Sequence, residues 1–164
     1  MTDPRKLALG GLCLALVTVA TMVLRIPIPA TQGYFNLGDA LIYTTALLFG
    51  PRFGLVAGGL GSALADVLGG YQQFAIATLI IKGLEGYVAG TLGREKTQTA
   101  ARAAACLAGG AVMVAGYFLA EAFALGLGVA AAAAEIPANV VQVVAGTIIA
   151  LLLTRALRRQ EQRA

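Results

Sequence analysis

The sequence predicts an all-α integral membrane protein with six transmembrane helices and both termini in the cytoplasm. Of its 164 residues, 59% are hydrophobic and 12% are charged, and the mean hydropathy is +0.81. Soluble domains are less apolar and more charged than this. The basic residues also gather at alternate segment ends, as the positive-inside rule requires. We therefore expect a single membrane domain over residues 1–164, with helices at 6–24, 39–49, 53–68, 74–92, 103–127 and 136–157.

The first helix, 6–24, follows Arg5 and Lys6 and ends before Arg25 and two prolines, Pro27 and Pro29, which cannot continue a helix. Gly11 and Ala15 on this helix form a small-xxx-small pair. Small residues at this spacing let another helix backbone approach closely. The partner is either another helix of the same bundle or a separate protein.

The next segments alternate turns with apolar helices. Residues 26–38 are rich in turn-forming and aromatic residues, and a loop of this length is typical of a gate over a binding site. Residues 39–49 form a short helix, and the Gly50–Pro51–Arg52 turn leads into 53–68. The third helix carries a small or polar stripe that we expect to face the bundle centre, because a carboxylate is costly in lipid; its members are Gly54, Gly58, Ser62 and Asp66.

The fourth helix, 74–92, has two charges three residues apart near its middle, Lys82 and Glu85. Intramembrane charges usually pair, so Lys82 neutralises Glu85 or Asp66, or else it contacts a ligand directly. Gly86 and Gly90 on the same helix predict close packing against a neighbour.

A polar stretch, 93–102, is interpreted as a cytoplasmic linker before the fifth helix. The alanine run at 130–134 is a good helix former and extends either the fifth helix or the sixth. In a six-helix topology the basic residues fall on the cytoplasmic side, with Arg25 as the exception outside; they are Arg5, Lys6, Arg52, Arg94, Lys96, Arg102, Arg155, Arg158, Arg159 and Arg163.

Polar and aromatic residues from most of the segments converge on the outer half of this bundle when placed by helical rise. Amide and carboxylate groups beside aromatic rings suit a small, ring-containing, neutral or weakly cationic solute. The candidate substrate-binding residues are Asn36, Asp39, Asp66, Tyr71, Lys82, Glu85, Tyr117, Glu121, Asn139 and Gln142. The chain has no histidine and only two separate cysteines, so neither a metal site nor a cofactor is expected, and no catalytic residue is assigned.

Several ordered motifs resemble the substrate-binding S components of energy-coupling factor (ECF) vitamin transporters, closest to the hydroxymethylpyrimidine and riboflavin-type branch. They are RIPIP from Arg25, GYFNLGDALI from Gly33, LFGPRFGLVAGGLGSALADVLGGY from Leu48 and IIKGLEGYVAG from Ile80. The resemblance implies a binding subunit that captures a vitamin or its precursor from outside. It also implies docking on a transmembrane coupling subunit with two ATPases, through a small-residue motif on the first helix that Ala8, Gly11 and Ala15 match.

Two other functions use some of the same residues or would need residues that the sequence lacks. A stand-alone ion- or proton-coupled transporter would use Asp66, Lys82 and Glu85 as a relay, although no long internal repeat supports it. A membrane enzyme is disfavoured because no serine or cysteine lies beside a candidate base. The basic residues sit at segment ends and not in a stripe, which indicates membrane orientation and excludes nucleic acid as a partner. ATP hydrolysis is expected only in partner subunits, because no Walker A motif is present.

Overall fold

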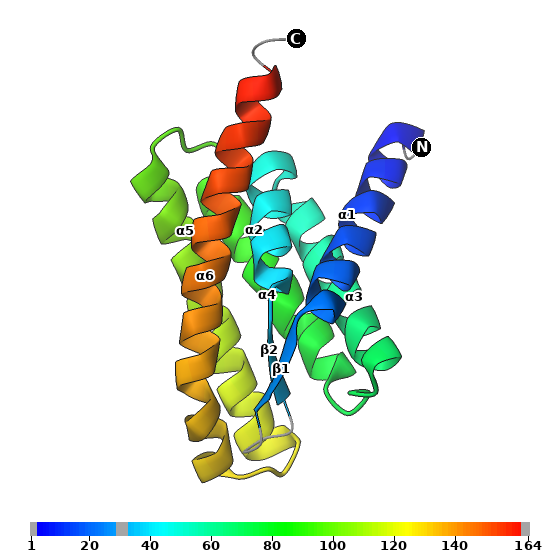
Figure 1. The fold of residues 1–164 in the computed structure, drawn as a ribbon, viewed down its shortest axis with the longest axis vertical. Coiled ribbons are helices and arrows are strands. Elements are labelled where there is room, and N and C mark those ends of the chain that lie inside the picture. Colours follow the sequence, from blue (N-terminus) through cyan, green and yellow to red (C-terminus); the bar gives the residue numbers. More distant parts are fainter. Residues whose placement is uncertain (1–2, 29–32, 162–164) are drawn as a thin grey trace.

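The computed structural model describes residues 3–28 and 33–161, and this part of the chain forms six α-helices, one π-helical turn and a two-stranded hairpin (Figure 1). Pro29, Arg163 and the tip of the predicted gate lie outside the described residues. The elements are α1 (Pro4–Val23), β1 (Arg25–Ile28), β2 (Gly33–Asn36), α2 (Gly38–Phe49), α3 (Pro51–Gly69), α4 (Ala75–Gly93), α5 (Thr99–Leu119), η1 (Ala120–Ala124) and α6 (Val129–Glu161).

The first four predicted helices are confirmed to within two residues at each end, because strong local signals bound them. Asp3 caps α1 by accepting a hydrogen bond from the backbone N–H of Arg5 at 3.0 Å, and Pro4 occupies the first turn. Between α2 and α3, Gly50 has a φ of 97°, a left-handed conformation that favours glycine, and Pro51 begins α3. These residues fix the two sharpest boundaries in the chain.

The segment predicted as a loop at 26–38 is not irregular where the structure describes it. Residues 25–28 and 33–36 pair as antiparallel strands, with Arg25 opposite Asn36 and Ile28 opposite Gly33. Paired strands satisfy their backbone N–H and C=O groups internally, which an open loop beside a membrane bundle could not do as readily. The hairpin places β2 against the bundle, between α1 and α6.

The second half departs further from the prediction. α5 begins at Thr99, inside the expected linker, and ends at Leu119, where the π-helical turn η1 carries the chain on. α6 begins at Val129 and not at residue 136, so the alanine run belongs to the sixth helix. Pro137 lies inside α6. Membrane-embedded helices accommodate proline because neighbouring groups satisfy the carbonyl that its missing N–H leaves free.

The α3 and α4 helices are in direct backbone contact through glycines. A Cβ on Gly54 would lie 2.5 Å from the carbonyl oxygen of Gly86, and one on Gly90 would lie 2.7 Å from Pro51. The close packing predicted for Gly86 and Gly90 is therefore confirmed, and so is the inward orientation of the small and polar stripe on α3, which is buried throughout.

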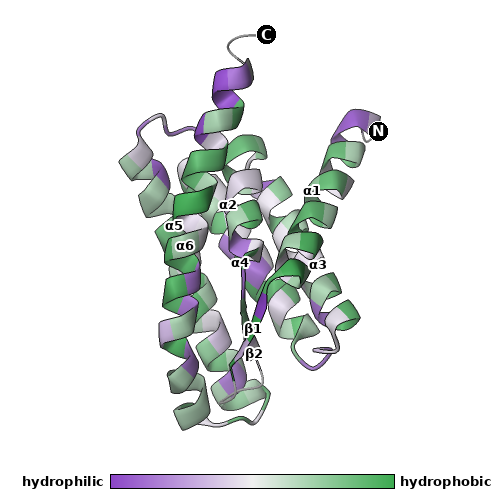
Figure 2. Cartoon of the chain, viewed as in Figure 1, coloured by the Kyte–Doolittle hydropathy of each residue, from purple (hydrophilic) through white to green (hydrophobic). Residues whose placement is uncertain are grey.

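Four described helices are long and apolar enough to cross a membrane: α1, α4, α5 with η1, and α6. α2 is apolar but has twelve residues, about 18 Å at 1.5 Å per residue, less than the ~30 Å hydrocarbon core. α3 is long enough but glycine-rich and polar along one face. Much of α1 and α6 is coloured hydrophobic in Figure 2, and many of their large apolar side chains are exposed, as a lipid-facing bundle requires.

The two ends of the bundle differ. The Pro4 end of α1 and the Glu161 end of α6 lie at the same end of the bundle, whereas the hairpin, the α3–α4 turn and η1 lie toward the opposite end (Figure 1). On α1, the small residues Ala8, Gly11 and Ala15 are exposed, and a Cβ on Gly11 would meet nothing within 4 Å among the described atoms. Packing inside the bundle, one of the two interpretations of this stripe, is therefore wrong.

Candidate functional site

A polar cavity lies under the hairpin, at the end of the bundle away from the termini. Six elements besides the hairpin surround it, because α1, α3, α4, α5, η1 and α6 each contribute at least one side chain. Its walls are Thr21, Gly33, Tyr34, Asn36, Ser62, Asp66, Phe74, Thr78, Lys82, Tyr117, Glu121, Glu135, Asn139 and Gln142. Most of these side chains are polar, although the helices that carry them are among the most apolar in the chain.

The cavity is narrow. Its volume is about 30 Å³. All the space between the wall atoms, with the solvent at the mouth included, amounts to about 430 Å³. The volume of about 30 Å³ is room for about two water molecules. A larger solute would therefore enter only if a lining side chain moved.

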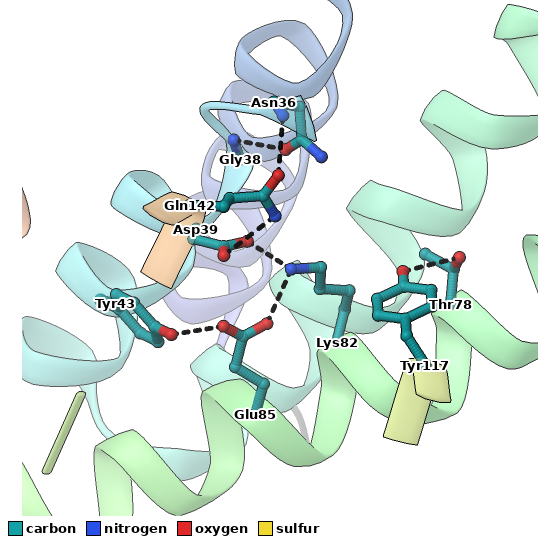
Figure 3. A network of polar contacts seen from close by, with 9 residues as sticks. All are labelled: Asn36, Gly38, Asp39, Tyr43, Thr78, Lys82, Glu85, Tyr117 and Gln142. Carbon is teal, nitrogen blue, oxygen red and sulfur yellow. Dashed lines mark hydrogen bonds and ion pairs between the residues drawn. The ribbon is translucent and has the colours of Figure 1, made fainter. Parts of the chain in front are cut away.

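A buried ion cluster lies next to this cavity, and one of its members, Lys82, lines the cavity wall (Figure 3). Lys82 on α4 forms ion pairs with Asp39 on α2 and, at 3.0 Å, with Glu85 on its own helix. The Tyr43 hydroxyl donates a hydrogen bond to Glu85 at 2.5 Å. All three charged side chains are at most 3% exposed. Pairing of Lys82 with Glu85 is thus confirmed, and Lys82 has Asp39, not Asp66, as its second partner among the described residues.

The cluster is tied to the hairpin by one amide side chain. Gln142 on α6 donates through Nε2 to Asp39 at 3.1 Å, and its Oε1 accepts the backbone N–H of Asn36 at 2.7 Å (Figure 3). The Asn36 side chain in turn accepts from the backbone N–H of Gly38 at 2.8 Å. A continuous chain of hydrogen bonds therefore runs from the ion cluster at the bundle centre to the last residue of β2.

The opposite side of the hairpin is held by aromatic contacts. The Tyr34 hydroxyl donates to Asp66 on α3 at 2.5 Å, and the Tyr34 and Tyr71 ring centroids lie 4.5 Å apart. Burial, reinforced by the Asp66 carboxylate, raises the pKa of the Tyr34 hydroxyl, which keeps it protonated as a donor. The Arg25 guanidinium lies 5.0 Å from the centroid of the Tyr34 ring and donates to the carbonyl of Ala65 at 2.8 Å.

Glu121, on the π-helical turn, is the most unusual residue of the cavity wall. It is 1% exposed, and it interacts with a second carboxylate in the wall, Glu135 on α6. Its carboxylate oxygens have no other hydrogen-bond partner among the described residues. The hydroxyls of Thr21 and Ser62, also in the wall, lack described partners. Buried polar groups are nearly always satisfied in proteins, so this wall is suited to a ligand that brings hydrogen-bond donors.

The structure places seven of the ten candidate residues on the cavity wall: Asn36, Asp66, Lys82, Tyr117, Glu121, Asn139 and Gln142. Asp39 and Glu85 lie behind it in the ion cluster, and Tyr71 lies outside it against Tyr34. Seven wall residues were not among the candidates: Thr21, Gly33, Tyr34, Ser62, Phe74, Thr78 and Glu135. Aromatic character and polarity in an apolar context could have indicated Tyr34, Phe74 and Glu135. Nothing in the sequence distinguishes Thr21 or Thr78 from other helix threonines.

Comparisons with known proteins find relatives along nearly the whole chain. A family model described as the S component of the ECF-type riboflavin transporter matches residues 1–159. An uncharacterized protein of Pyrococcus woesei is 49% identical over 133 residues, which is 81% of this chain and 88% of that protein. The thiamine precursor transporter HmpT of Lactococcus lactis subsp. cremoris is 35% identical over 94% of this chain and 89% of its own length.

Solved structures share the fold. The S component of a bacterial ECF transporter superposes with a TM-score of 0.77 at 20% identity, covering 96% of this chain and 98% of that one. An S component for biotin superposes with a TM-score of 0.64 at 18% identity, covering 100% and 96% of the two chains. The match along nearly the whole chain shows that this protein belongs to the S components of ECF-type transporters, the substrate-binding subunits of these membrane importers, and is a transport subunit rather than an enzyme.

Proposed function

We propose that this S component captures a small single-ring solute that carries amine donors, of the aminopyrimidine type found in thiamine precursors. The observation that carries the proposal is Glu121, a buried carboxyl group in the cavity wall whose oxygens have no described partner other than a second carboxylate, Glu135. An exocyclic amine or a protonated ring nitrogen would supply the missing donors, and a hydrogen bond to a charged group is worth about 1.5–3 kcal/mol.

The charge of the cavity supports a donor-rich ligand over an acidic one. Asp66, Glu121 and Glu135 contribute carboxylates to the wall, whereas Lys82 is already held by two carboxylates behind it. An anionic vitamin would meet net repulsion here. The narrow space favours one ring over the fused rings of a flavin, and the relative HmpT is named for a thiamine precursor.

The candidate residues divide into two proposed roles. Asn36, Asp66, Tyr117, Glu121, Asn139 and Gln142 would contact the ligand, with the Tyr117 ring as a flat wall held by a 2.9 Å hydrogen bond between its hydroxyl and Thr78. Asp39, Lys82 and Glu85 would position Gln142 from behind, and Tyr71 would support the Tyr34 ring. The hairpin would act as the gate.

Partners and topology complete the proposal. The exposed stripe of Ala8, Gly11 and Ala15 would meet a transmembrane coupling subunit that works with two ATPases. The chain would lie in the plasma membrane of a prokaryote with six crossings and both termini cytoplasmic, because the basic residues gather at the terminal end of the bundle and the positive-inside rule places them there.

The first experiment is to purify the protein in mild detergent from cells grown in rich medium, denature it and identify any released molecule by mass spectrometry. Titration with an aminopyrimidine thiamine precursor, riboflavin and biotin would follow, with thermal stabilisation as the readout. Stoichiometric release of the precursor, and stabilisation by it alone, is the expected result. Preferential binding of riboflavin would overturn the substrate assignment. Absence of any bound or stabilising vitamin, with uptake that needs only a proton gradient, would instead support the relay alternative.

A further inference from the structure

A second groove lies at the opposite end of the bundle, between the α4–α5 turn, the start of α5 and the end of α6. Four arginines line it: Arg102 on α5 and Arg155, Arg158 and Arg159 on α6. Its volume is about 460 Å³, whereas the cavity under the hairpin has a volume of about 30 Å³. It is thus an open and strongly basic site that substrate capture does not use.

Two of these arginines are held in place by backbone carbonyls. Arg102 donates from Nε to the carbonyl of Lys96 at 2.7 Å, and Arg158 donates to the carbonyl of Leu47 at 3.0 Å. In the described part of the chain, none of the four arginines forms an ion pair with a carboxylate. Like charges held together without a counter-charge favour an anion between them.

The first turn of α5 adds to this preference for an anion. Gln98, the residue that caps α5, makes no side-chain hydrogen bond to the free backbone N–H groups, and the first turn has no acidic residue. Thr97 and Thr99 line the groove at this point and bring hydroxyl donors. A helix N-terminus favours phosphate through its free N–H groups and its dipole.

The groove is also apolar on one side, which a site for a small inorganic anion would not need. Leu151 and Leu152 on α6 line it beside the arginines, and Leu152 is 63% exposed. The groove lies where the apolar part of α6 passes into its basic end, which is coloured hydrophilic in Figure 2. In a membrane-spanning helix, such a change from apolar to basic residues marks the membrane interface. Basic pockets between helices at this depth suit the headgroups of acidic lipids.

We propose that this groove binds the headgroup of an anionic phospholipid, with the phosphate among the arginines and the start of an acyl chain against Leu151 and Leu152. The bound lipid would join the start of α5 to the end of α6, two segments that otherwise repel each other. It would thereby stabilise the end of the bundle remote from the cavity.

The test uses the full-length protein in a neutral detergent. Phosphatidylglycerol, phosphatidylcholine and glycerol phosphate are added separately, with bound lipid measured by native mass spectrometry and stability by thermal unfolding. Phosphatidylglycerol is expected to bind and to raise the unfolding temperature, whereas the other two have little effect. The double variant R155Q/R159Q is expected to bind phosphatidylglycerol at least fivefold more weakly while keeping its vitamin affinity, because the cavity lies at the other end.

The matched control is R5Q/K6Q, which removes two exposed charges from the same end of the bundle but from α1. This variant should bind phosphatidylglycerol as the parent protein does. Equal binding of phosphatidylglycerol and phosphatidylcholine would show that the groove is not a site for anionic lipid. An equal loss of phosphatidylglycerol binding in R155Q/R159Q and R5Q/K6Q would show the same. Glycerol phosphate acting as strongly as the lipid would overturn the lipid assignment in favour of a free phosphate.

Discussion

The side-chain amide of Gln142 accepts the backbone N–H of Asn36 at 2.7 Å, and this bond connects the hairpin to the centre of the bundle. Through its other end the same amide donates to Asp39. Gln142 also lies in the cavity wall. A ligand in contact with Gln142 would therefore act on the hairpin through this bond as well as by direct contact, which gives a physical link between occupancy and closure.

Replacing Gln142 by leucine is predicted to loosen the hairpin. The Asn36 N–H loses its acceptor, which costs about 1 kcal/mol for the lost hydrogen bond and more for the unsatisfied N–H group. Together these correspond to roughly a tenfold increase in the rates of hydrogen exchange and ligand dissociation. Hydrogen exchange in ligand-free protein should speed up at Asn36, and ligand should dissociate faster. Gln73→Leu, an exposed change at the same end of the bundle, is the control. Unchanged exchange at Asn36 would show that Gln142 does not hold the hairpin.

Replacing Glu121 by glutamine is predicted to weaken binding of an aminopyrimidine about 10- to 100-fold. The neutral amide keeps the shape but loses a charge-assisted hydrogen bond of about 1.5–3 kcal/mol. Stability without ligand should hold or rise, because a buried carboxylate beside a second one, Glu135, is removed. Isothermal titration would measure the affinity, with the exposed Glu95→Gln as control. Equal affinities in both variants would remove Glu121 from the binding site.

Replacing Lys82 by methionine is predicted to destabilise the fold by about 3–5 kcal/mol, since Asp39 and Glu85 would be left buried without their counter-charge. The triple variant D39N/K82M/E85Q removes the charges together and should recover much of the loss. Thermal unfolding in detergent measures both, and Lys96→Met, at an exposed position in the α4–α5 turn, is the control. A single variant as stable as the parent would mean that the cluster contributes nothing to the fold.

Replacing Gly54 by alanine is predicted to cost about 1–3 kcal/mol, because the new Cβ would press on the backbone of Gly86. Gly11→Ala is the matched change on α1, where a Cβ meets open space. It should leave the stability of the isolated protein unchanged or slightly raised, since alanine favours a helix. Comparable unfolding temperatures for the two variants would contradict the close approach of α3 and α4.

Local signals along the chain are enough to predict where the first four helices begin and end and which side of α3 is buried. Prolines, glycines and arginines interrupt the apolar runs, and these signals act within a few residues. Lipid cannot solvate Asp66, so the stripe that carries it had to face protein wherever the other helices lie. The same reasoning predicts that polar side chains converge at one end of the bundle. In the structure, seven of the ten candidate residues line one cavity there.

Which polar groups contact one another depends on the tertiary structure. Lys82 and Asp39 are 43 residues apart, and Gln142 and Asn36 are 106 apart, so their pairing depends on how α2, α4 and α6 pack. The hairpin forms only when both strands pair in register, and strands of four residues carry little sequence signal for strand formation on their own. The alanine run fitted either of two helices locally. Helical propensity and hydropathy act along the chain, whereas ion pairs, cavities and strand pairing arise only when distant segments are brought together.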